Sequence, residues 1–194
     1  TRRQATCKRR FPAHRTGRAV LSESADASVE QGWVTEQWAT VAGQKAFLIR
    51  VSLDGELGWG IHSENAVMLA IYDAVLAAGA KPFGMYALNS MRIEKGYRTW
   101  KGDLSTDYTL LEGGIERFSR FDKPQDFPGK AALLAEKQQG SKKGFVTLIV
   151  DADFADAPYM STIWSGDEVV GETTSGDWGY RVNASIALGM VRAD

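Results

Sequence analysis

The hydrophobic pattern of this chain changes near residue 143, and that change limits the folds available to it. Upstream, Val67, Ile71 and Val75 recur at helical spacing and form one apolar stripe. Downstream, short apolar runs alternate with turn residues, which is typical of strands. The order predicts an α+β region followed by a small antiparallel β-barrel.

Capping and turn residues place the individual elements. Ser63 is the predicted N-cap of the first helix, and Pro128 lies near the start of a third. Ser165-Gly166-Asp167 is a hairpin turn signal. We expect helices over 64–78, 86–95 and 127–138, and strands over 45–53, 58–62, 144–150, 161–164, 168–174 and 184–191.

Composition divides the chain into four segments. Residues 1–20 hold seven basic residues and no acid, so 1–32 is expected to be a disordered or non-native basic tail. A nucleic-acid arm and an organelle transit peptide are the alternatives for this tail. The other expected segments are an α+β subdomain over 33–126, a linking helix over 127–142 and the β-barrel subdomain over 143–194.

Overall composition excludes several functional classes. The net charge of −1 argues against a nucleic-acid-binding protein, and the single cysteine excludes an intrachain disulfide framework. Two histidines are too few for most metal sites. The sequence contains no apolar run of about 18 residues, so no membrane span is expected. Phosphate-binding and nucleophile-elbow motifs are also missing. We therefore predict no catalytic residue and no metal site in this chain.

Three stretches carry the remaining chemical information. Gly55 to His62 places the Glu56 carboxylate among glycines beside Trp59, and the charged stretch Met91 to Arg98 ends a predicted helix at Gly96. Val170 to Gly176 is followed by Ile186 to Val191. Asp103, Glu94, Asp107 and Glu112 are expected to be cap, turn or salt-bridge residues.

In this order the stretches resemble the glycine-cleavage T-protein (aminomethyltransferase) family. Gly55-Glu56-Leu57-Gly58-Trp59 is similar to its GELGW/GEDG element, and Met91 to Arg98 is similar to LRLEKGYR. Gly171 to Gly176 resembles VGxxTSG, and Ile186 to Val191 resembles IALGYV. The similarity is nearest to the tetrahydrofolate-binding branch in dimethylglycine and sarcosine dehydrogenases. It implies an incomplete T-protein-like fold, in which a ferredoxin-like mixed α/β half-domain precedes the barrel.

The resemblance also implies a cofactor and roles for five residues. Such proteins hold tetrahydrofolate and pass a one-carbon unit from an amine to its N5, so 33–126 would be a folate-binding subdomain. Glu56 would accept hydrogen bonds from the pterin, and Arg92 would bind a carboxylate of the folate tail. Trp59, Tyr97 and Arg98 would line the cavity. From the residues alone, Trp59 also fits a core position, and Arg92 a structural arginine bridging subdomains.

Other parts of the family pattern are missing from this sequence. Nothing in 1–32 resembles the half that carries the family's catalytic Asp, and no FAD-binding fingerprint is present. We therefore expect a fragment of a folate-dependent aminomethyltransferase or dehydrogenase, weak or inactive alone, with FAD only in a missing N-terminal domain. The barrel is expected to be truncated.

The alternatives are a non-enzymatic folate-binding or regulatory module, completed by a partner that supplies the missing half, and a demethylase of the same family. The expected partner is a small-molecule folate, without nucleic acid or membrane. The expected location is cytoplasmic, or the mitochondrial matrix in a eukaryote.

Overall fold

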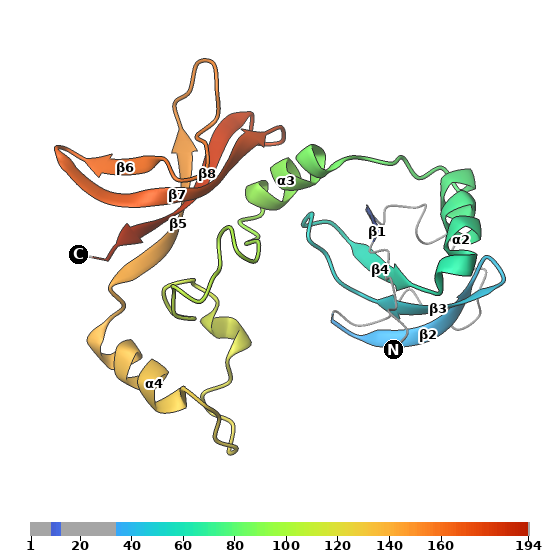
Figure 1. The fold of residues 1–194 in the computed structure, drawn as a ribbon, viewed down its shortest axis with the longest axis horizontal. Helices are drawn as coiled ribbons and strands as arrows, with labels where there is room; N and C mark the ends of the chain where they lie inside the picture. Colours follow the sequence, from blue (N-terminus) through green and yellow to red (C-terminus); the bar gives the residue numbers. More distant parts are fainter. Residues whose placement is uncertain (1–8, 13–33, 194) are drawn as a thin grey trace. The chain divides into compact units, whose positions relative to one another are not determined.

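The computed structural model describes residues 9–12 and 34–193, and the chain divides into two units, Thr1–Leu88 and Asn89–Asp194. We call them unit 1 and unit 2 and describe each by itself (Figure 1). Helix α3 (Met85–Glu94) begins in unit 1 and ends in unit 2.

Unit 1 contains an antiparallel sheet with the strand order β1-β4-β3-β2. The strands are β1 (Arg9–Pro12), β2 (Glu36–Val41), β3 (Gln44–Ile49) and β4 (Gly58–His62). Helix α2 (Asn65–Ala77) follows β4 directly. The register aligns Trp38 with Phe47 and Phe47 with His62.

Alternation along the strands separates the two faces of this sheet. Ala39 and Val41 of β2 and Ala46 and Leu48 of β3 are buried with Ile71 and the other core residues of the unit. Side chains of successive strand residues point to opposite faces. The row Trp38, Phe47 and His62 therefore lies on the face away from this core, where the Trp38 and Phe47 ring centroids are 5.1 Å apart.

Unit 2 is built on a second antiparallel sheet, with the order β5-β8-β7-β6 (Figure 1). Its strands are β5 (Lys143–Val150), β6 (Thr162–Ser165), β7 (Glu168–Gly179) and β8 (Ala184–Arg192). The short 3-10 helix η1 (Glu116–Phe118) and helix α4 (Lys130–Gln139) precede β5. Ile93 of α3 packs with Ile186 and Leu188 of β8 and with Phe145.

Strand β7 is irregular where it carries the Thr-Ser-Gly motif. Its register against β8 shifts between Thr173 and Ser175. Such a bulge re-aims the side chains beside it. Thr173, Thr174 and Ser175 are all buried, so the strand directs three successive hydroxyls into the protein.

The predicted elements over 34–193 are confirmed, with differences at some boundaries. The N-cap of α2 is Glu64, so the prediction for Ser63 is wrong; the Ser63 hydroxyl instead donates to the Glu64 carbonyl. Helix α4 begins at Lys130 because Gly129 takes the left-handed conformation at its N-cap. Residues 9–12 also differ from the expected tail, since β1 pairs with β4; the rest of 1–32 lies outside the described residues.

The predicted β-barrel is corrected by the sheet order. In the described part of unit 2, β5 and β6 lie at opposite edges of a four-stranded sheet, and no pairing closes it. The architecture is α+β, with three α-helices and two antiparallel sheets among the described residues. The ferredoxin-like arrangement stays a prediction. No described helix is long and apolar enough to span a membrane.

Candidate functional site

Glu56 lies on a tight turn that leads into β4. Asp54 is buried, and its Oδ1 accepts hydrogen bonds from the Ser52 hydroxyl (2.6 Å) and the Glu56 amide (3.0 Å). The Ser52 hydroxyl accepts from the Gly55 amide at 2.9 Å, and Gly55 has a φ of 82°. A residue with a side chain would be strained at this φ. The sequence Ser52 to Glu56 therefore holds a half-buried carboxylate on a fixed backbone.

Trp59 follows on β4, and its surroundings are those of a core residue. The side chain is buried and belongs to the same apolar cluster as Ile61 and Ile71. The Arg50 guanidinium lies 5.7 Å from its ring centroid. The alternative that Trp59 is a core residue is thus the one that its packing supports, and its lining of a folate cavity stays a prediction.

Arg92 of α3 is 4% exposed and donates five hydrogen bonds inside unit 2. Its Nε and Nη2 both donate to Asn89 Oδ1, at 3.0 and 2.7 Å. Its Nη1 donates to Tyr97 O at 3.1 Å and Asp103 Oδ2 at 2.5 Å, and Nη2 also donates to Ser175 Oγ at 2.6 Å. A guanidinium has five N–H groups, so each has an acceptor within the chain. The predicted contact of Arg92 with a folate carboxylate stays a prediction, and it would require one of these bonds to break.

Asp103 is the acceptor at the centre of this arrangement and is 0% exposed. Besides Arg92, its Oδ2 accepts from the amide and the hydroxyl of Thr99, at 2.8 and 3.0 Å. Its Oδ1 accepts from the hydroxyls of Thr174 (2.6 Å) and Ser175 (2.7 Å). We call these residues the Asp103 network: Asn89, Arg92, Thr99, Asp103, Thr174 and Ser175. The expected salt-bridge role of Asp103 is confirmed.

The Asp103 network joins two of the sequence motifs that carry the family resemblance. Asn89 Nδ2 donates to Asp177 of β7, and the Ser90 hydroxyl donates to the Trp178 carbonyl. Glu94 Oε1 accepts from the Arg181 amide at 2.7 Å, in the turn after β7. These contacts fasten the C-terminal half of α3 along β7, from the bulge to the end of the strand.

Tyr97 and Arg98 lie just past the end of α3. The Tyr97 amide donates to the Arg92 carbonyl at 2.8 Å, which closes the helix after Gly96. The Arg98 guanidinium carbon lies 4.1 Å from the centroid of the Phe145 ring, and Nη1 donates to the Gly96 carbonyl at 3.1 Å. Burial lowers the pKa of Arg98, and the positive charge of Arg117 lowers it further, against the opposing effect of Asp103 and Glu116.

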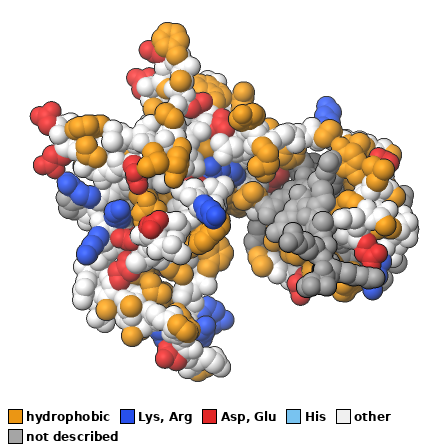
Figure 2. Space-filling model, viewed as in Figure 1, with side chains coloured by type: hydrophobic (Ala, Val, Ile, Leu, Met, Phe, Trp, Pro, Cys, Tyr) orange, Lys and Arg blue, Asp and Glu red, His pale blue; other side chains and the backbone are white. Residues whose placement is uncertain are grey.

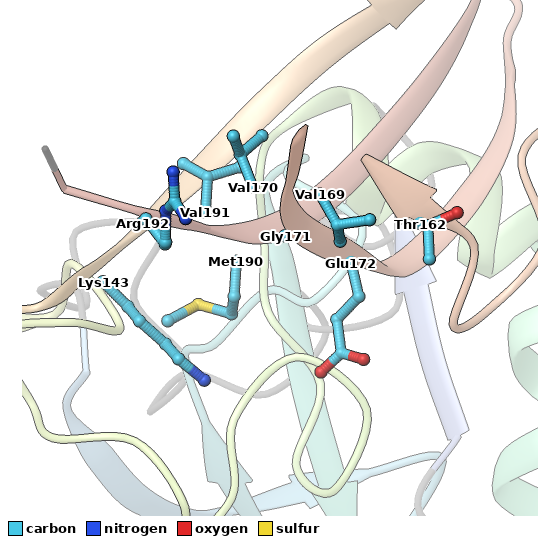
Figure 3. Close-up of a pocket in the computed structure, with 9 residues that line it drawn as sticks. All are labelled: Lys143, Thr162, Val169, Val170, Gly171, Glu172, Met190, Val191 and Arg192. Atoms are coloured by element: carbon cyan, nitrogen blue, oxygen red, sulfur yellow. The ribbon is translucent and has the colours of Figure 1, made fainter. Parts of the chain in front are cut away.

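A separate hollow of about 350 Å³ lies along β7 and β8 of the same sheet (Figure 3). Figure 3 shows Lys143, Met190 and Glu172 extending from one side of the strands, with Val170 and Val191 toward the other. Tyr108 donates to Glu172 Oε1 at 3.3 Å. Burial, and secondarily the negative charge of Glu172, raises the pKa of Tyr108. None of the five predicted site residues lines this hollow.

The predicted site residues thus belong to both units. Arg92, Tyr97 and Arg98 lie together in unit 2, and Glu56 and Trp59 belong to unit 1. Asn89, Thr174 and Ser175 were not singled out as contributing side chains by the sequence, although the last two lie in the VGxxTSG-like motif. Among the described residues, no group of three or more His, Cys, Asp or Glu side chains is arranged to hold a metal ion.

Comparison with protein families accounts for these motifs. Residues 16–123 match the model of the GCVT N-terminal domain, and residues 143–194 match the glycine cleavage T-protein C-terminal barrel domain. The chain belongs to the glycine cleavage T-protein family. The family match starts at residue 16, inside the segment 1–32 that composition predicts to be a disordered or non-native basic tail.

Relatives of this T-protein family chain include several enzymes. It is 40% identical to human dimethylglycine dehydrogenase over 147 residues, which is 74% of this chain and 17% of that protein. It is 34% identical to mouse sarcosine dehydrogenase over 182 residues, 90% of this chain and 20% of that protein. With the aminomethyltransferase of Thermosynechococcus vestitus it shares 36% identity over 150 residues, 77% of this chain and 40% of that protein.

A solved structure shows the same fold. The glycine cleavage system aminomethyltransferase T of Bartonella henselae superposes with a TM-score of 0.73 and 23% sequence identity. The match covers 90% of this chain and 48% of that one. The chain therefore spans between about a sixth and a half of the length of these relatives.

Proposed function

We propose that this chain supplies the tetrahydrofolate-binding portion of an enzyme that transfers one-carbon units from N-methylated amines. The similarity to dimethylglycine and sarcosine dehydrogenases supports this branch of the family. In such a reaction the folate, when bound, accepts the one-carbon unit at N5. Because the chain spans a small part of these relatives, the proposal for the chain itself concerns binding rather than turnover.

The turn Ser52 to Glu56 is the observation on which the proposal rests. A carboxylate can accept two N–H donors from an aminopyrimidine edge, and a charged acceptor makes such bonds shorter and stronger. The Asp54 carboxylate fixes the backbone amide of Glu56, so the Glu56 side chain starts from one position. Gly58 and Gly60 next to it in β4 leave little bulk along the strand. We propose that Glu56 recognises the pterin ring through this edge.

In unit 2 we propose a supporting role for Arg92. Since all five of its N–H groups have acceptors inside the unit, it contributes by holding α3 and β7 together. Tyr97 and Arg98 follow the end of α3, close in sequence to the contact of Arg92 with β7. Within unit 2, Arg92 would then position the residues that follow Gly96.

Equilibrium binding of tetrahydrofolate under anaerobic conditions tests the proposal. We compare the wild-type chain with Glu56→Gln, which keeps the shape and removes the charge. The matched control is Glu64→Gln, the same change at an exposed position of the same unit. Loss of a charge-assisted contact predicts an affinity about tenfold weaker for Glu56→Gln and unchanged for Glu64→Gln. Equal affinities for all three proteins would contradict the assignment of Glu56.

A further inference from the structure

The hollow of about 350 Å³ in unit 2 lies on one face of the sheet. Four residues stand directly opposite one another on neighbouring strands and therefore share this face: Thr162, Glu172, Met190 and Phe145. Lys143 lies two residues before Phe145 on β5, so it points to the same side. Figure 3 shows Met190 between Lys143 and Glu172. The hollow thus has an ammonium group and a carboxylate on either side of an apolar floor.

Tyr108 connects the two charged groups. Lys143 Nζ lies 5.2 Å from the centroid of the tyrosine ring, and the tyrosine hydroxyl donates to Glu172 Oε1 at 3.3 Å. The loop that carries Tyr108 is held to β5, because the Phe145 amide donates to the Glu112 carbonyl at 3.0 Å. The ammonium group and the carboxylate therefore both lie within reach of one tyrosine side chain that the fold keeps in place.

These two charges are not compensated within the described part of the chain. There, the Lys143 ammonium group contacts the Tyr108 ring and no carboxylate, and Glu172 receives one bond that is longer than the usual range of about 2.5–3.0 Å. Arg192, which lines the same hollow, differs because it forms an ion pair with Glu168 at 2.9 Å. Lys143 is exposed and Glu172 is half-buried, so a ligand in the hollow can reach both.

Charge and size together define the class of ligand. An anion beside Lys143 would be repelled by Glu172, and a cation beside Glu172 would be repelled by Lys143. A zwitterion avoids both repulsions, because it places an opposite charge beside each group. The volume is at the lower end of the about 300–1,000 Å³ of ligand pockets, so it suits one small molecule rather than a peptide or a nucleotide. Much of the remaining lining is apolar: Val169, Val170, Met190 and Val191.

We propose that this hollow binds a small apolar α-amino acid as a zwitterion, with its ammonium group at Glu172, its carboxylate at Lys143 and its side chain over Met190. The inference goes beyond the proposed function, because it concerns another ligand and a site that lies wholly in unit 2. Tyr108 is the positioning residue, since it holds both charged side chains at the hollow.

The first test compares three ligands of one shape. L-Leucine, isoamylamine, which lacks the carboxylate, and isocaproate, which lacks the ammonium group, are titrated into the intact chain. Binding is followed by the NMR signal of the Met190 methyl group, with isotope-labelled methionine. We expect saturable binding of leucine with a Kd of about 1 mM, and binding about fivefold weaker for each of the other two.

The second test assigns each charge to its residue. We expect Lys143→Gln to weaken leucine about fivefold and leave isoamylamine unchanged, and Glu172→Gln to weaken leucine about fivefold without weakening isocaproate. The matched controls are Lys142→Gln and Glu116→Gln, which remove the same charges from exposed residues of unit 2 outside the hollow. Lys143→Gln changes an exposed side chain, so it tests the site even if Glu172→Gln fails to fold.

Two results would overturn the inference. One is the absence of saturable leucine binding, or equal affinity for leucine in wild type, Lys143→Gln and Glu172→Gln. The other is isocaproate or isoamylamine binding as tightly as leucine, which would indicate a site for a single charge. Glu56→Gln changes unit 1 and should leave leucine binding unchanged, so failure of the folate proposal and failure of this one are distinguishable.

Discussion

Replacing Asp103 by Asn tests how much the Asp103 network stabilises unit 2. The substitution keeps the side-chain shape and removes one charge at a position that is 0% exposed. Arg92, 4% exposed, then becomes a buried cation without its counter-charge. Breaking a buried ion pair by removing one partner costs about 3–5 kcal/mol of the free energy of unfolding.

The geometry places this variant at the lower end of that range. The amide oxygen of Asn can still accept the bonds that Asp103 Oδ2 receives from Arg92 and Thr99. The amide nitrogen would face Thr174 and Ser175, whose hydroxyls can rotate to accept instead of donate. We therefore expect a loss of about 3 kcal/mol, a large fraction of the about 5–15 kcal/mol typical of a domain.

Urea unfolding followed by circular dichroism and tryptophan fluorescence measures this loss. With a denaturant slope of about 1–3 kcal/mol/M, the transition of Asp103→Asn should move down by about 1–3 M. The control is Asp122→Asn, because Asp122 and Arg120 are both 77% exposed and 3.6 Å apart. An exposed pair contributes less than about 1 kcal/mol. If the two variants shift the midpoint equally, the buried network is not what stabilises unit 2.

Two further predictions concern the sheet of unit 2. Burial, and secondarily Glu172, raise the pKa of Tyr108 in the folded protein. The contribution of the protonated Tyr108 side chain to stability is therefore full below the ordinary tyrosine pKa of about 10, and it is lost as pH rises through the higher folded-state pKa. Unfolding free energy measured from pH 8 to 11.5 should therefore fall more in wild type than in Tyr108→Phe; equal slopes would contradict this. A Cβ at Gly171 would collide with the backbone carbonyl of Met190, whereas one at Gly144 meets nothing within 4 Å. Thermal unfolding should show Gly171→Ala destabilised by about 1–3 kcal/mol and Gly144→Ala nearly neutral, and the reverse order would refute the packing described for β7.

Individual helices and strands could be predicted from the sequence because their signals, such as apolar spacing and turn residues, lie within the element itself. The stripe of Ile71 and Val75 fixed the buried face of α2, and the Ser165-Gly166-Asp167 turn fixed the hairpin of β6 and β7. The N-cap of α2 is predicted at Ser63 but lies at Glu64, because Glu64 takes the capping backbone conformation without a side-chain bond. Whether strands at opposite edges of a sheet pair with each other depends on distant parts of the chain, so the barrel was predicted where the described residues give an open sheet.

The candidate site shows the same division between local and long-range information. The motifs around Glu56 and Arg92 were recognised, and the family comparison agrees with them. Their partners were harder to predict, because Asp103 meets Thr174 and Ser175 across about 70 residues of sequence. A charged residue in a sequence motif suggests a contact with a ligand. Only its burial and its hydrogen bonds in the structure show whether its donors are free for such a contact. This is why Arg92, whose five N–H groups all have acceptors in unit 2, has a supporting role in our account.

The loop between β5 and β6 is a feature of unit 2 that no sequence motif indicates. The loop joining β5 to β6 projects from the sheet (Figure 1), and both hydrophobic and acidic side chains are exposed on it (Figure 2). Phe154 of this loop is 100% exposed, while the Thr173 hydroxyl donates to the Pro158 carbonyl and the Ser185 hydroxyl donates to Asp156 Oδ1. Gly176 allows this closeness, because a Cβ at that position would collide with the Ala157 carbonyl. The loop is therefore held to the sheet by these hydrogen bonds, while Phe154 is left exposed.

The central claim is that the Glu56 carboxylate recognises the aminopyrimidine edge of a reduced folate. The most direct measurement pairs a change in the protein with a change in the ligand: tetrahydrofolate and its 2-desamino analogue are titrated into wild type and Glu56→Gln. We expect Glu56→Gln to weaken tetrahydrofolate about tenfold and the 2-desamino analogue hardly at all, because the lost acceptor matters only when the donor is present. An equal loss of affinity for both ligands, or none for either, would contradict the claim.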